Sequence, residues 1–184
     1  DKIFLQSDQI LDYITYCDYN SKDATWEKSN MRAELNERFF NLAFSKEEQE
    51  AIIQTKLDNG AEASTEDKVF LLSVNDITNT TYGYCTDGAN LSASRILKCT
   101  ECAQLDNCND FYEREDYQYA WWLRTPGIPS YDNNPMFATY VNALGSCDNE
   151  TTGLTTVSHA GIAPAIYVDI NSPLWSTKKT EVRD

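Results

Sequence analysis

Apolar and polar residues alternate with two different periods along the chain, and the period predicts the type of each element. The first apolar run, Ile-Phe-Leu in residues 2–6, predicts a short strand, while Ile10, Leu11 and Ile14 fall at helical spacing. Residues 25–44 form the clearest helical pattern, because apolar residues recur on one side, at Trp26, Met31, Leu35, Phe39 and Leu42. Ser45 and Glu48 match a capping box, so a second helix is expected from residue 46 to about residue 55.

The second half of the chain predicts strands. Residues 69–72 form a compact apolar run typical of a buried strand, and residues 73–77 predict a single helical turn. Further strands are expected at residues 119–123, 137–141, 155–157 and 162–170, with a hairpin turn at residues 142–145. Early helices and late strands without helical crossovers predict an α+β fold, with two N-terminal helices packed on a small, mainly antiparallel sheet.

Length and residue types predict one domain over residues 1–184. Of the 184 residues, 41% are hydrophobic and 12% aromatic, which is enough to bury a core. Residues 78–116 are expected to form a long irregular insertion, because they hold four of the six cysteines and much Asn, Asp and Thr.

Three residues are assigned structural roles. Trp26 lies on the apolar side of the first helix. Trp121 and Trp122 are adjacent, so in a strand they point to opposite faces; both are expected in the core, and the alternative is that one offers a stacking surface. Arg124 is expected to bind loop carbonyls or a carboxylate. Trp26, Trp122 and Arg124 are therefore interpreted as structural residues.

The charge of the chain excludes one class of partner. Fifteen basic and 29 acidic residues give a net charge of −14, which repels the phosphates of nucleic acids. No stretch approaches 18 consecutive apolar residues, so no membrane span is expected. The acidic stretch within residues 106–116 lacks EF-hand spacing and is interpreted as a solvated loop in preference to a calcium site.

The cysteines leave three possibilities open. Cys85, Cys99, Cys102 and Cys108 are candidates for disulfides, for unpaired thiols, or for a zinc site whose second half departs from the usual C-x-x-C spacing. Six cysteines in total and three Asn-x-Ser/Thr sequons favour an extracellular or cell-surface location.

Catalytic motifs are not evident in the sequence. His159 is the only histidine, and a lone histidine in a loop is more often a surface residue than a catalyst. The chain has no G-x-S-x-G motif and no motif that places two carboxylates for glycoside hydrolysis. We expect a protein that is not an enzyme and has no cofactor, with calcium or zinc as the less favoured alternatives.

Two polar segments, residues 129–134 and 142–152, are candidates for ligand-binding loops. The candidate residues in them are Tyr131, Asp132, Asn133, Asn134, Asn142, Asp148 and Asn149. Asn, Asp and Ser side chains make adaptable hydrogen bonds and tyrosine is a rigid apolar anchor, which is typical of binding loops. The same residue types also favour turns, and the sequence does not separate these two interpretations.

Five stretches of the sequence together resemble a known family. They are residues 25–36, 43–48, 65–73, 121–127 (Trp-Trp-Leu-Arg-Thr-Pro-Gly) and 161–166 (Gly-Ile-Ala-Pro-Ala-Ile). The set resembles a bacterial domain family of unknown function, common in anaerobic Firmicutes and often found in secreted multidomain proteins. Its members usually have W-L-R-S-P-G and G-V-R-P-A-L at the last two stretches, so Ala163 replaces an arginine here.

The last two stretches also resemble the C-type-lectin-like fold of formylglycine-generating, sulfatase-modifying enzymes, and this fold is what the resemblance implies. The family's opening strands, ahead of Lys2, are then missing or supplied by another part of the protein. The favoured function is a non-catalytic extracellular recognition module that binds a glycan or a protein through the two polar loops. The alternatives are a structural subunit of a bacterial surface assembly, completed by a strand from a neighbouring chain, and an enzyme of undefined type.

Overall fold

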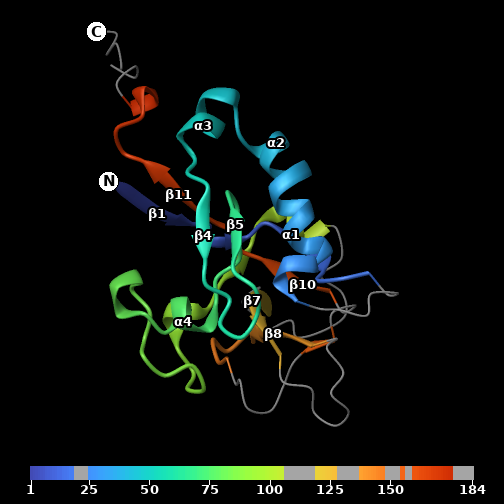
Figure 1. The fold of residues 1–184 in the computed structure, drawn as a ribbon. Helices are drawn as coiled ribbons and strands as arrows, with labels where there is room; N and C mark the ends of the chain where they lie inside the picture. The colour runs from blue at the N-terminus through green and yellow to red at the C-terminus, as the bar shows by residue number, and fades with distance from the viewer. Residues whose placement is uncertain (19–24, 106–118, 128–136, 148–153, 156–158, 176–184) are drawn as a thin grey trace, which may run out of the picture.

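The computed structural model of the chain is a mixed α+β fold with short helices and several small sheets (Figure 1). It describes residues 1–18, 25–105, 119–127, 137–147, 154–155 and 159–175. Within these residues, five of the seven strand pairings are antiparallel, in agreement with the predicted α+β class. No helix in these ranges is long and apolar enough to cross a membrane.

The largest sheet has five strands in the order β3-β10-β7-β8-β9. Their bounds are β3 (Asp12–Thr15), β10 (His159–Ile162), β7 (Trp121–Pro126), β8 (Phe137–Val141) and β9 (Leu154–Thr155). Neighbouring strands are antiparallel except β10 and β7, which are parallel. Trp121 and Trp122 on the central strand are both fully buried, so both faces of β7 are covered.

Three pairs of strands form smaller sheets. They are β1 (Lys2–Gln6) with β11 (Ala165–Asp169), β4 (Thr55–Leu57) with β5 (Thr65–Asp67), and β2 (Gln9–Ile10) with β6 (Lys98–Cys99). The first two pairs are antiparallel and the third is parallel. A 3₁₀ turn, η5 (Pro173–Trp175), follows β11.

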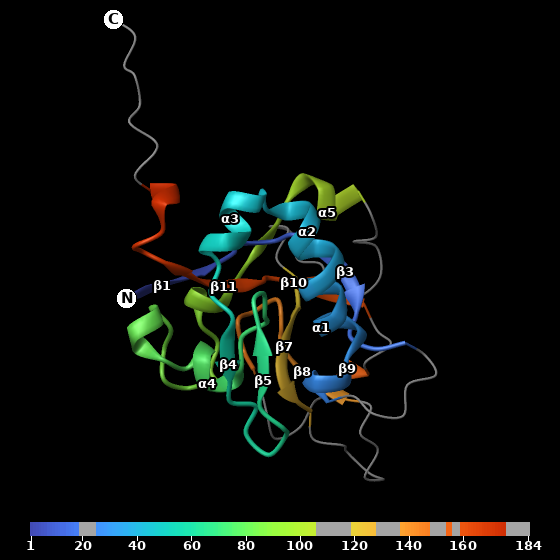
Figure 2. The same cartoon turned by 45° about the horizontal axis from the view of Figure 1, so that its top comes forward.

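The predicted helix of residues 25–44 consists of four consecutive segments (Figure 2). They are the 3₁₀ turn η1 (Trp26–Lys28), α1 (Asn30–Glu34), the π-helical turn η2 (Leu35–Phe39) and α2 (Phe40–Ala43). The capping box at Ser45 is confirmed, since its hydroxyl accepts from the Glu48 amide and its own amide donates to the Glu48 carboxylate. This box begins α3 (Lys46–Ala51), which ends before residue 55.

Three sequence-based predictions differ from the structure in their secondary structure. Ile10 and Ile14 lie in strands β2 and β3 and not in a helix, because long-range pairing with β6 and β10 overrides the short local spacing. The strand predicted at residues 162–170 is found as β11 but begins later, at Ala165, because Pro164 has no N–H to donate, and Ile162 is the last residue of β10. Residues 69–72 are buried as predicted, although they form one bridge to Ala165 and no strand.

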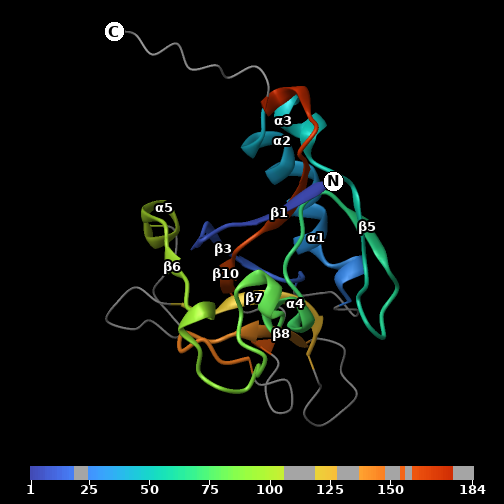
Figure 3. The ribbon, with the colours of Figure 1, turned by 90° about the vertical axis from the view of Figure 1, so that its left-hand side faces the viewer.

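The described part of the predicted insertion, residues 78–105, contains several short elements (Figure 3). After α4 (Val74–Ile77) come η3 (Thr80–Tyr82), η4 (Ala93–Arg95), β6 and α5 (Glu101–Leu105). Arg95 is fully buried and donates to the carbonyls of Gly145 at 2.7 Å, Asp87 at 2.8 Å and Asn90 at 2.6 Å. Hydrogen bonds from one guanidinium group therefore organise this segment.

Candidate functional site

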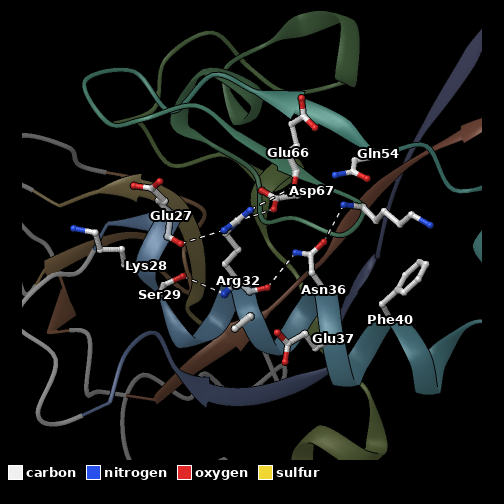
Figure 4. Close-up of a pocket in the computed structure, with 12 residues that line it drawn as sticks. Glu27, Lys28, Ser29, Arg32, Asn36, Glu37, Phe40, Gln54, Glu66 and Asp67 are labelled. Atoms are coloured by element: carbon white, nitrogen blue, oxygen red, sulfur yellow. Dashed lines mark hydrogen bonds and ion pairs between the residues drawn. The ribbon is translucent and has the colours of Figure 1, made fainter.

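An open groove of about 440 Å³ lies beside α1, where the helical segment faces β5 (Figure 4). Two of the stretches that carry the family resemblance, residues 25–36 and 65–73, line it together. Most of the lining side chains are polar, among them Glu27, Arg32, Asn36, Glu37, Glu66 and Asp67. This combination of shape and polar lining makes the groove the candidate functional site.

Asp67 lies at the base of the groove and is almost completely buried, with 1% of its side chain exposed. Its carboxylate accepts three hydrogen bonds, from Arg32 Nε at 2.6 Å, Trp26 Nε1 at 2.9 Å and Thr65 Oγ1 at 2.7 Å. A buried carboxylate is stable only when it is paired and hydrogen-bonded, and both conditions hold here. The base of the groove is therefore a fixed structural element.

Arg32 and Asn36 hold the helical segment against β5 and the chain that follows it. Arg32 also donates to the Glu27 carbonyl at 3.1 Å and weakly to the Glu66 carbonyl at 3.4 Å. Asn36 accepts from the Lys68 amide at 2.9 Å and donates to the Val69 carbonyl at 2.8 Å. The Asn36 amide uses both its acceptor and its donor group within the protein, and Arg32 uses three of its five N–H donors there.

The far wall of the groove is formed by Lys68 and Phe40. The Lys68 ammonium lies 4.7 Å from the centre of the Phe40 ring and donates to the Gln49 carbonyl at 3.2 Å. Phe40 is 8% exposed, so its ring face is not available for stacking on a sugar. Both basic groups thus have internal partners, a carboxylate for Arg32 and a carbonyl and an aromatic ring for Lys68.

The rim of the groove carries acceptor groups that point into solvent. Glu27, Glu37, Gln54 and Glu66 are exposed, and within the described part of the chain their side chains make no hydrogen bond or ion pair. Figure 4 shows the carboxylates of Glu27, Glu37 and Glu66 directed away from the buried Arg32–Asp67 pair. Unlike the base, the rim retains its full capacity to accept hydrogen bonds from a ligand.

The base of the groove continues into the core as a chain of polar contacts. Asn59 donates to Thr65 Oγ1 at 3.2 Å and accepts from Arg124 Nε at 3.2 Å. Arg124, of which 5% is exposed, also forms a 2.6 Å ion pair with Asp76 and donates to the Leu71 carbonyl at 2.8 Å. Arg124 thus binds both a carboxylate and a carbonyl, the two kinds of partner expected from the sequence.

Most of the residues predicted to bind a ligand lie outside the described ranges. They are Tyr131, Asp132, Asn133, Asn134, Asp148 and Asn149. Asn142 is described, and its side-chain oxygen accepts from the amides of Leu144 at 2.9 Å and Ser146 at 3.1 Å. This oxygen closes the turn after β8, which corresponds to the turn interpretation of such residues and uses the acceptor that a ligand would need.

No disulfide joins the described cysteines, and Cys108 lies outside the described ranges. Cys85 accepts from Arg95 Nη1 at 3.0 Å, while Cys99 is buried next to the Tyr13 hydroxyl at 3.4 Å and Cys102 is exposed on α5. Hydrogen bonding from Ser92, followed by the nearby Arg95 charge, holds the pKa of the Cys85 thiol below its usual value. The residues that the structure describes contain no group of His, Cys, Asp and Glu able to hold a metal ion.

The remaining residues singled out from the sequence are structural or exposed. Trp26 is fully buried, and Trp122 is fully buried with its Nε1 donating to the Ile14 carbonyl at 2.9 Å. Trp121 donates in the same way to the Arg95 carbonyl at 3.0 Å. His159 is exposed at the start of β10, opposite Thr15.

Sequence reasoning missed the importance of Asp67, Arg32, Asn36 and Arg95. Three of them lie in stretches quoted for the family resemblance, but no motif assigns them a role. One signal was present: Asp67 and Lys68 come just before the apolar run of residues 69–72, which is predicted to be buried. Arg95 has no comparable sequence signal, because most of its partners are backbone carbonyls.

Comparison with known proteins gives one result. No curated protein and no solved structure matches the chain. The expected C-type-lectin-like fold is therefore not supported by a structural relative. The model of a family described as a domain of unknown function, DUF6273, matches residues 1–170. The match covers all five stretches on which the resemblance rests. The chain therefore belongs to the DUF6273 family.

Proposed function

We propose that the domain is a non-catalytic extracellular recognition module and that it binds a basic segment of a protein ligand in the groove beside α1. The supporting observation is the separation of charges in this groove. Of the four exposed charged side chains that line the groove, three are the carboxylates of Glu27, Glu37 and Glu66, and the fourth is Lys28. The basic groups of Arg32 and Lys68 are less exposed and have internal partners. A ligand with lysine or arginine side chains would supply the donors that these carboxylates lack.

The buried base favours binding because it holds the rim in place. Arg32 joins η1, α1 and β5 through its contacts with Asp67 and with the carbonyls of Glu27 and Glu66. A preorganised site loses little conformational entropy when its ligand binds. The net charge of −14 also attracts a basic ligand over a distance and raises its association rate.

Fluorescence anisotropy with a labelled, lysine-rich peptide tests this proposal. The variant Glu37→Gln/Glu66→Gln removes two rim charges with little change in shape. Exposed ion pairs contribute about 0.2–1 kcal/mol each, so we expect the dissociation constant to rise about 2- to 30-fold. Binding should also weaken as salt screens the charges. The matched control, Glu47→Gln/Glu50→Gln, removes two exposed charges from α3, outside the groove, and should change the affinity much less.

A glycan array examines the other class of ligand. If the domain binds a neutral glycan, and binding is lost on Tyr131→Ala or Asn133→Ala but not on the rim variant, the groove proposal is wrong and the two polar loops carry recognition. Absence of peptide binding up to about 1 mM at low salt would also reject the proposal.

A further inference from the structure

The paired strands β1 and β11 leave apolar side chains at the surface. Ile3 and Leu5 on β1 are 49% and 45% exposed, although they lie opposite the apolar residues Val168 and Ile166 of β11. Leu5 also lines a small groove of about 150 Å³ on this face, together with Trp175, which is 50% exposed. Apolar surface of this kind is typical of a contact with another chain.

The hydrogen-bond register shows which backbone groups of β1 face outward. The Ser7 amide donates to the Pro164 carbonyl at 2.9 Å, and the Ile170 amide donates to the Asp1 carbonyl at 3.4 Å. Hydrogen-bonded pairs alternate along an antiparallel ladder, so the odd-numbered residues of β1 bond to β11. The N–H and C=O groups of Lys2, Phe4 and Gln6 therefore point to the opposite side.

The two outer edges of the β1–β11 strand pair differ in their backbone hydrogen bonds. On β11, the Tyr167 carbonyl accepts from the Ile53 amide at 2.8 Å, and Ala165 exchanges two hydrogen bonds with Phe70, at 3.0 and 2.7 Å. On β1, no backbone partner for the outward groups is found among the described residues, and β1 pairs with β11 alone. β1 contains no proline and no bulge, two of the features that protect an exposed edge, and Lys2 is its one charged residue.

We infer that β1 pairs antiparallel with β1 of a second copy of this chain, about a two-fold axis at Phe4. In this register Phe4 faces Phe4 of the copy, and Lys2 faces Gln6 of the copy at each end. The three residue pairs exchange two hydrogen bonds each, six in total, and no like charges face one another. Ile3 then contacts Leu5 of the copy, so the exposed apolar face continues across a four-stranded sheet.

Aromatic contacts fix the position of β1 in the single copy of the chain. The Phe4 ring stacks on Tyr82 with 4.5 Å between ring centres and contacts Tyr167 at 5.4 Å. The edge is therefore ordered before association, and little entropy is lost when it pairs. A two-stranded ribbon is marginal by itself and gains from additional strands. This surface is separate from the groove beside α1, so the inference does not depend on the proposed function.

Charge opposes the association. Each copy carries a net charge of −14, and the five-residue strand buries less than the roughly 800 Å² per partner of a standard interface. We therefore expect a dissociation constant between about 10 µM and 1 mM. Because salt screens the repulsion between the copies, the dimer should be tighter at about 0.5 M than at about 0.05 M salt.

Sedimentation equilibrium of the 184-residue chain tests the inference. The average mass should rise from 20.9 kDa towards twice that value, 41.8 kDa, as the protein concentration increases. Ile3→Glu places a carboxylate opposite Leu5 of the copy and should weaken the dimer at least about tenfold. Leu42→Glu, at a 74% exposed leucine on α2, is the matched control and should leave the dimer unchanged.

Hydrogen exchange identifies the surface that associates. The amides of Lys2, Phe4 and Gln6 should exchange rapidly in the dilute protein and become protected when it is concentrated. Those of Ile3 and Leu5, already bonded to β11, should be protected at both concentrations. If Ile3→Glu perturbs folding, Lys2→Pro is the second variant, because it removes an outward amide that β11 does not use.

Two results would overturn the inference. One is a monomer at about 1 mM protein and about 0.5 M salt. The other is a dimer that Ile3→Glu and Lys2→Pro both leave intact, with the outward amides of β1 still unprotected.

Discussion

Replacing the buried carboxylate of Asp67 by an amide should strongly destabilise the domain. Asp67→Asn keeps the size of the side chain but removes its charge and converts one acceptor oxygen into an NH₂ donor. Three donors converge on the carboxylate, from Arg32, Trp26 and Thr65. The amide oxygen cannot serve all of them, so at least one donor loses its acceptor.

The size of the effect follows from the burial of each donor. Arg32 is 28% exposed and can recover part of its lost bond from water, so losing the charge-assisted bond costs about 1–2 kcal/mol. Trp26 is fully buried, and leaving its indole N–H unsatisfied costs about 1–3 kcal/mol. The sum is about 2–5 kcal/mol, which corresponds to a fall in Tm of about 4–20 °C for a domain of this size.

Urea unfolding monitored by tryptophan fluorescence measures this change. Glu66→Gln is the matched control, because it makes the same change of charge at the adjacent, exposed residue and should alter the unfolding free energy by less than about 0.5 kcal/mol. If the free energies of unfolding of Asp67→Asn and Glu66→Gln differ by less than about 0.5 kcal/mol, the buried network does not stabilise the fold as argued.

Two further predictions concern the segment around Arg95. Gly145→Ala would place a Cβ 2.1 Å from the Ser92 carbonyl oxygen at a φ of +75°, and should cost more than about 3 kcal/mol in urea unfolding. Gly60→Ala, at a φ of +69° with open space, should cost only about 1 kcal/mol, and equal losses would contradict the predicted clash. The lowered pKa of Cys85 enlarges its thiolate fraction, so the pH midpoint of its reaction with iodoacetamide should be lower in the folded protein than in urea. Mass spectrometry of the peptide that contains Cys85 measures both midpoints. Identical midpoints would contradict the lowered pKa.

Local patterns predicted the elements whose signals lie within a few residues. Strands β1 and β8 have the predicted bounds, and the capping box at Ser45 begins α3 as expected. Hydrophobic alternation and a cap reflect contacts between near neighbours, so the sequence contains them directly. Where partners were distant, as for Ile10 and Ile14, short helical spacing led to the wrong element.

The candidate site was less predictable than the fold. The groove depends on Asp67 meeting Trp26 and Arg32, which lie 41 and 35 residues away. Asn142, the one described residue among those predicted to bind a ligand, closes a turn with its side-chain oxygen. A residue type shows what a side chain can do, but only its neighbours decide whether that capacity is used within the protein or left for a ligand.

Composition, hydrophobic period and the order of motifs are properties of the chain alone, and they were enough to predict the α+β class, the main helical segment, the family and the strongly acidic charge. Two further properties follow from the folded arrangement of the chain: which polar groups are buried and paired, and which backbone edge remains open. Both depend on contacts between residues far apart in the chain, where burial makes an unpaired donor or carboxylate costly and exposure does not.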